Sequence, residues 1–268
     1  MEQKEITKTR LIIYVRMAYG LTCLMGILMW YGSTKGYDLT VFPTAQMMYP
    51  AAGLTRQNWK SAVLIVLVFV GIYIVRTVVS VAVQGVADGS GMQYVKEWIA
   101  MFQNPVMWIN IVELPINYFF VFIAFFGEEY GWRYYLQPVL QKRFGLRAGV
   151  IVLGVVWGLW HIPDDLFYYT QTSGIQMIFA QQITCISLGI FFAYAYMKTQ
   201  NIWVTVCLHY LNNNLIPIIS GTLSADVLEN QNVSWRDLPV AVVLNGLCFG
   251  FFLLADVFKK KEIEKENS

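Results

Sequence analysis

Histidine and charge are both scarce in this chain. Its 268 residues include two histidines, and charged residues make up 13% against 57% hydrophobic residues. The net charge is +2, and no patch combines basic with aromatic residues, which argues against a nucleic-acid partner. So little charge beside so much apolar sequence is typical of a protein that crosses a membrane several times.

The cysteines have no informative spacing, and the commonest zinc-peptidase motif is absent. The four cysteines lie far apart in apolar segments, and no pair has metal-ligand or redox spacing. We therefore interpret Cys23, Cys185, Cys207 and Cys248 as small hydrophobic residues. The chain contains no HExxH sequence, which argues against a typical zinc peptidase.

Long apolar runs predict an all-α, polytopic membrane bundle, because a transmembrane helix needs about 20 apolar residues. The first run is too long for a cleavable signal peptide and predicts a membrane anchor. Strong runs fall at 11–31, 62–84, 113–138, 146–168, 175–197, 202–220 and 238–258, with a weaker one at 41–55.

Basic residues at both ends of the chain predict its topology. They cluster at Lys4, Lys8 and Arg10 and again at 259–261. By the positive-inside rule both termini are expected in the cytoplasm, so the number of crossings is even. We therefore expect eight transmembrane helices, with the run at 41–55 crossing the membrane. A further interfacial helix is expected at 92–112, before the fourth span.

A doubled acid and a histidine mark the fourth and fifth spans. Glu129 and Arg133 are four residues apart and predict an ion pair, whereas Glu128 is turned about 100° away. Gly145 predicts the turn of an antiparallel hairpin between these spans. Because Glu128 and His161 are equally far from this turn, we expect them at the same depth. Ionisable groups inside a membrane are candidates for function.

His209 and Asn213 mark the seventh span, where their spacing puts them on one helical face. A histidine and an amide can donate hydrogen bonds to a developing oxyanion. The alternative is a structural hydrogen bond between helices. Counting from the helix ends places His209 roughly 9 Å away in depth from His161, a mismatch that helix tilt or misplaced helix boundaries must absorb.

Other polar and aromatic residues near these motifs have less specific interpretations. Trp157 is expected to pack in the bundle. Pro163 is expected to kink the fifth span just after the histidine. Asp164 and Asp165 are expected to be solvated near the outer mouth of the bundle.

Three motifs together resemble a known family. EEYGWR at 128–133, WGLWH at 157–161 and HYLNN at 209–213 occur in the order found in the CPBP (Abi/Rce1-type) intramembrane proteases, which include CAAX-processing endopeptidases. The resemblance covers about 105–220, which is the expected catalytic core. Two regions flank this core. Residues 1–104 are expected to hold the N-terminal helices and the interfacial segment, and residues 221–268 a last helix and a basic tail.

The resemblance implies an enzyme that hydrolyses a peptide bond in a membrane-associated peptide or protein. It implies a role for each motif: Glu128 and His161 activate the attacking water, Glu129 and Arg133 support the site, and His209 with Asn213 forms the oxyanion hole. Two positions depart from the family pattern, since Trp157 replaces a frequent phenylalanine and Tyr134 a frequent glycine. The implied partners are this substrate and the lipid bilayer, in a bacterial plasma membrane.

The sequence leaves three alternatives open. One is a zinc peptidase with Glu128, His161 and His209 as metal ligands, although we expect no cofactor. Another is a non-catalytic immunity or scaffold protein, and the third is a transporter. The substrate is also open, because the family is implicated in peptide maturation, bacteriocin self-immunity and prenyl-protein processing. Nothing in the sequence fixes the oligomeric state.

Overall fold

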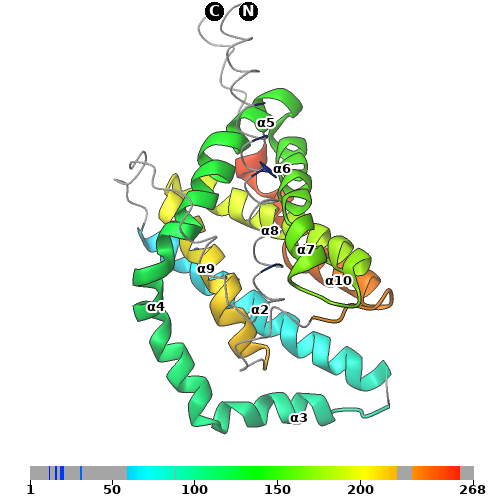
Figure 1. Ribbon diagram of the computed structural model, residues 1–268. Helices are drawn as coiled ribbons and strands as arrows, with labels where there is room; N and C mark the ends of the chain where they lie inside the picture. The colour runs from blue at the N-terminus through cyan, green and yellow to red at the C-terminus, as the bar shows by residue number, and fades with distance from the viewer. Residues whose placement is uncertain are drawn as a thin grey trace, which may run out of the picture.

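The protein is an all-helical bundle in the part that its computed structural model describes (Figure 1). That part comprises residues 59–87, 89–221 and 231–259, together with residues 12, 16, 19, 20 and 31. Its α-helices are α2 (Trp59–Ala87), α3 (Gln93–Ala100), α4 (Pro105–Glu129), α5 (Gln137–Phe144), α6 (Leu146–Trp160), α7 (Ile162–Phe167), α8 (Gly174–Thr199), α9 (Ile202–Ile219) and α10 (Asp237–Cys248). The predicted fold class, an all-α membrane bundle, is thereby confirmed.

Five helical stretches of the described residues are long and apolar enough to cross a membrane. Each overlaps one of the predicted runs between 62 and 220. They are Lys60–Ala87, Pro105–Phe144, Leu146–Phe167, Gly174–Thr199 and Ile202–Ile219. The predicted spans at 11–31 and 41–55 lie outside the described residues, apart from isolated positions in the first. The same is true of the tail after residue 259, so the count of eight and the side of the termini stay predictions.

The predicted interfacial helix at 92–112 is two elements instead of one. Helix α3 ends at Ala100, and the side-chain oxygen of Asn104 then accepts a hydrogen bond from the Val106 amide (3.0 Å). Pro105 occupies the first turn of α4, where a missing N–H is harmless. This N-cap starts the long helix at residue 105, several residues before the predicted span.

The last predicted span, 238–258, is also interrupted. Helix α10 has 12 residues, or about 18 Å, which is short of the roughly 30 Å of a bilayer core. It is followed by 3₁₀ segments at Gly250–Leu254 and Asp256–Phe258. Gly246 and Gly250 lower the helix propensity where α10 ends. The range 238–258 is therefore not one continuous helix.

Helix α8 lies at the centre of the bundle, between α9 on one side and α6, α7 and α10 on the other (Figure 1). Its Phe191 and Phe192 are fully buried. The ring of Phe191 lies 5.4 Å from Phe69 of α2 and 5.6 Å from Phe249, just after α10. Stacked and edge-on aromatic pairs of this kind add to the burial of apolar area. They join α2 and the α10 region to the central helix.

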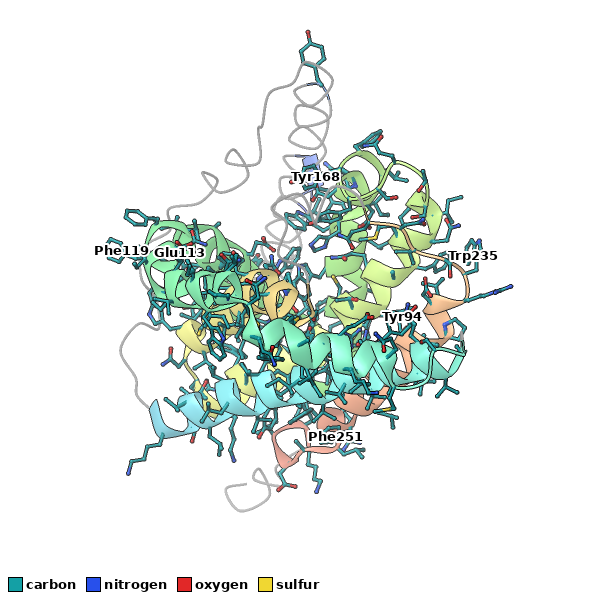
Figure 2. The ribbon with its side chains drawn as sticks, turned by 90° about the horizontal axis from the view of Figure 1, so that it is seen from below. Tyr94, Glu113, Phe119, Tyr168, Trp235 and Phe251 are labelled. Carbon is teal, nitrogen blue, oxygen red and sulfur yellow. The ribbon has the colours of Figure 1, made fainter. Side chains whose placement is uncertain are left out.

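The outer face of α4 is apolar and exposed. Figure 2 shows Glu113 and Phe119 on this face, at the edge of the molecule. Four of its large side chains, Val112, Ile116, Phe119 and Phe120, are 63–73% exposed. A contiguous patch of this kind is unfavourable in water and favourable in lipid. Together with the five apolar helices, it identifies an integral membrane protein.

The turn between α5 and α6 is the hairpin that the sequence predicts. Gly145 ends α5 and begins α6 with φ +88°, a conformation that glycine adopts without a Cβ clash. The two helices pack directly against each other. The continuous helix Pro105–Phe144 and the span beginning at Leu146 are therefore neighbours in sequence and in space.

Small residues allow α6 to approach α8 closely. A Cβ atom on Gly154 would lie 2.6 Å from the Cα atom of Ile186, and one on Gly158 would meet the Gln182 side chain. The two glycines are four residues apart, the small-xxx-small pattern of close helix pairs in membranes. The Gln182 amide adds a hydrogen bond to the Gly154 carbonyl (3.2 Å).

We predict that Gly154→Ala destabilises the protein, because its methyl group would force two backbones apart at a cost of about 1–3 kcal/mol. The measurement is the thermal midpoint of the purified protein in detergent. Gly71→Ala on α2 is the matched control, since a Cβ there meets nothing within 4 Å. The control should keep or slightly raise the midpoint. Equal midpoints for both variants would contradict the close packing of α6 on α8.

Candidate active site

The GEEYGWR motif lies where α4 changes into a π-helical segment, Tyr130–Leu136. Glu129 and Arg133 are both fully buried, and Arg133 Nε lies 3.2 Å from Glu129 Oε2. The ion pair that the spacing predicts is thus present. π-Helical turns are frequent at functional sites because the wider turn redirects side chains within a helix.

The other oxygen of Glu129 joins this motif to α9. His209 Nδ1 lies 3.0 Å from Glu129 Oε1, and the histidine is buried. A carboxylate only accepts hydrogen bonds, so Nδ1 carries the proton and donates. Glu129 therefore bridges Arg133 and His209, two residues 76 positions apart, in the interior of the bundle.

Glu128 has a different environment from its neighbour. Its side chain is half-buried overall, with Oε2 fully buried. The indole groups of Trp132 and Trp157 lie beside its carboxyl, and His209 is close enough to interact with it by charge when protonated. The two adjacent acids thus separate as expected: one is committed to an ion pair, and the other is left partly accessible.

His161 ends α6 and precedes Pro163, so it stands at the kink where α7 begins. Its Nδ1 lies 2.9 Å from the carbonyl oxygen of Trp157 and 3.7 Å from Cys185 Sγ. Because the carbonyl can only accept, Nδ1 is the protonated nitrogen. In the neutral ring this leaves the Nε2 lone pair free to accept a proton.

Trp157 connects the two histidines. Its ring centroid lies 5.8 Å from that of His161 and 5.4 Å from that of His209, and the Arg133 guanidinium carbon is 4.9 Å from it. The sequence predicts a packing role, and Trp157 is indeed buried, but it packs inside the site. Its position one turn before His161, on the same helical face, is the signal that could have placed it there.

The expectation for the two aspartates after Pro163 is wrong for Asp165. Asp165 is fully buried, and neither of its carboxylate oxygens has a hydrogen-bond partner among the described residues. Asp164 lies close enough to Glu128 for their charges to interact. The reason is the kink at Pro163: α7 packs against α8 and carries Asp165 into the bundle, while Asp164 stays half-buried.

Asn213 lies apart from the buried contacts. Its side chain is exposed, whereas His209 on the same helix is buried. The Asn213 oxygen accepts a hydrogen bond from the Asn212 amide (2.9 Å), and no described contact joins it to His209. The structure therefore gathers Glu128, Glu129, Arg133, His161 and His209 around Trp157, with Asn213 one helical turn away.

The side chains that could bind a metal ion are few and scattered in the described part of the chain. In the described part of the chain, no group of three or more His, Cys, Asp and Glu side chains is gathered so that it could hold one. Glu128, His161 and His209 are the candidate zinc ligands, and they form no such group. Both histidines use Nδ1 in hydrogen bonds, so Nε2 is the nitrogen through which each could bind a metal.

Comparison with known proteins places this site in a matched segment. Residues 110–215 match the family described as Type II CAAX prenyl endopeptidase Rce1-like. The protein named CAAX prenyl protease 2 from Methanococcus maripaludis is 27% identical over 125 residues, which cover 43% of this chain and 45% of the relative. The chain thus matches less than half the length of this curated relative. No solved structure matches the chain.

The matched segment contains all three motifs and every residue of the cluster around Trp157. The resemblance that the motifs indicate is therefore confirmed by two independent comparisons. Over residues 110–215 the chain is thus similar to the Rce1-like family of CAAX prenyl endopeptidases.

Proposed function

We propose that this protein is an intramembrane endopeptidase that cleaves a peptide bond in a membrane-associated peptide or protein. The observation that carries the proposal is the separation of roles between adjacent acids. Glu129 is fully committed to Arg133 and His209, while Glu128 is half-buried beside Trp157, the same residue whose ring and carbonyl contact His161. A non-catalytic scaffold has no need for an accessible carboxyl and a histidine of fixed tautomer around one tryptophan.

In this proposal Glu128 and His161 activate the attacking water. The Glu128 carboxylate takes a proton from water as the oxygen attacks the scissile carbonyl carbon. His161 Nε2 accepts or returns a proton in the later steps, because its Nδ1–H is held by the Trp157 carbonyl. The proton finally passes to the leaving amine, so that atoms and charge balance.

His209 and Asn213 supply the oxyanion donors. With His209 Nδ1 bonded to Glu129, the free donor must be Nε2–H of the imidazolium form, whose counter-charge is the Glu129 carboxylate. The Asn213 amide can supply a second N–H. Fixed donors in a site without bulk water stabilise a tetrahedral oxyanion more effectively than water does.

The comparisons also favour one class of substrate. A relative named CAAX prenyl protease and a family described as CAAX prenyl endopeptidase favour a substrate with a prenylated cysteine near its carboxyl end. The exposed apolar face of α4 is suited to the lipid through which such a substrate arrives. The assay substrate is therefore an internally quenched peptide that ends in a prenylated CAAX sequence.

We predict that Glu128→Ala and His161→Ala each reduce peptide cleavage to background, a loss of at least about 10²–10⁴ in kcat. The measurement is initial cleavage rate in reconstituted vesicles at matched protein amounts. Glu113→Ala is the control, because this glutamate lies on the exposed outer face of α4 (Figure 2) and should leave the rate unchanged. Wild-type cleavage by either site variant would refute the mechanism.

His209→Ala and Asn213→Ala should each leave measurable activity, with kcat lowered by about 10²–10³. The reason is that each variant removes one donor to the oxyanion and leaves the water-activating pair in place. Steady-state kinetics on the same peptide separate kcat from KM. An unchanged kcat for Asn213→Ala would remove that residue from the oxyanion hole.

Activity should be independent of added zinc. If the carboxylate is the base, the purified protein holds well under one zinc ion per chain, and strong chelators leave the cleavage rate largely intact. A zinc enzyme would lose activity with the ion and regain it on reconstitution, since the metal lowers the pKa of its bound water. Metal analysis of the protein and chelation with zinc rescue distinguish the two mechanisms.

A further inference from the structure

A second polar chain runs through the bundle and ends at Asn213. It begins on α10, where the Asn245 side-chain oxygen accepts from Arg76 Nε of α2 (2.9 Å). The guanidinium carbon of Arg76 lies 5.8 Å from the ring centroid of Tyr73. The Tyr73 hydroxyl donates to Asn212 Oδ1 (2.6 Å), and Asn212 Nδ2 donates to Asn213 Oδ1 (2.9 Å).

The hydrogen bonds of this chain have a fixed direction. Since Tyr73 donates to the oxygen of Asn212, the nitrogen of Asn212 is turned toward Asn213. The oxygen of Asn213 is then occupied, and its NH₂ group faces away from the chain. Asn213 is exposed, so these two N–H donors are accessible to a ligand. An Asn amide without such partners could present either its oxygen or its nitrogen.

Tyr73 is well suited to impose this direction. Its side chain is 5% exposed, and its ring packs against Phe69 and Phe249 in the core. The nearby Arg76 cation polarises the phenol and strengthens its O–H as a donor in the low-dielectric interior. Asn245 in turn holds Arg76, which shows that this intramembrane arginine faces a partner in the bundle.

We propose that Tyr73 is a positioning residue for catalysis: through Asn212 it holds the amide of Asn213 with its NH₂ group toward the oxyanion. This inference rests on the proposed function, in which Asn213 is an oxyanion donor. An oriented donor requires no reorganisation as charge develops, and this is the source of its catalytic effect. Tyr73, Arg76 and Asn245 all lie outside the family-matched residues 110–215, so the motifs do not contain this device.

The test compares Tyr73→Phe and Asn212→Ala with a matched variant, Thr77→Val. Thr77 lies one turn further along α2, and its hydroxyl contacts Ser220 (3.4 Å), so it also links α2 to the end of α9. The assay is cleavage of the quenched prenylated peptide, with thermal midpoints measured in parallel. Tyr73→Phe and Asn212→Ala should lower kcat by roughly tenfold, less than the 10²–10³ of losing the donor itself. KM should change little, and Thr77→Val should behave as wild type.

A double-mutant cycle with Asn213→Ala then separates positioning from packing. If Tyr73 acts through Asn213, Tyr73→Phe has no further effect on kcat once Asn213 is alanine. Three outcomes would overturn the positioning role alone. The first is an additive loss of kcat in the double variant, and the second is an equal loss in Thr77→Val. The third is a wild-type kcat for Tyr73→Phe while Asn213→Ala is impaired. A wild-type kcat for Asn213→Ala would overturn both the proposed oxyanion hole and this inference.

Discussion

The buried carboxylate of Glu129 is the constraint on which the site depends. It lies 3.2 Å from Arg133 Nε and 3.0 Å from His209 Nδ1, and all three side chains are buried. Breaking a buried pair by removing one partner typically costs about 3–5 kcal/mol, because the other charge is left uncompensated. The bridge therefore fixes α9 against the end of α4. It also places His209 against Trp157, which His161 contacts as well, although the two histidines lie different numbers of residues from their helix ends.

Two departures from regular helix place the reactive groups. The π-helical segment Tyr130–Leu136 follows directly after Glu129, and the kink at Pro163 follows directly after His161. In lipid, such irregular backbone is tolerated only where neighbouring protein covers it. Here α8 packs against both places, and α9 packs against the π-helical segment. The irregularities thus occur where neighbouring helices cover them, which is also where side chains must depart from the helical period to converge.

Local spacing predicted contacts within a helix and at its turn, and it did not predict contacts between distant helices. The Glu129–Arg133 pair and the hairpin at Gly145 followed from i, i+4 geometry and a single glycine. Periodicity specifies a face of a helix, but not what packs on that face, so the burial of Asp165 was missed. The central place of Trp157 was missed because an aromatic residue in an apolar helix is usually packing. The bond from Tyr73 to Asn212 joins residues 139 positions apart, a distance over which the sequence carries no local signal.

The family-matched segment is not the limit of the packed unit. Residues 110–215 contain the charged groups, yet Phe69 and Phe249 outside them stack on Phe191 in the core. The same two outer regions, α2 and the end of α10, contribute the polar chain that reaches Asn213. The buried charged groups and the residues that contact the Asn213 amide through Asn212 thus come from different parts of the chain. A relative with the same three motifs but other residues on α2 would keep the buried Glu129 bridge while orienting the amide that corresponds to Asn213 by other means.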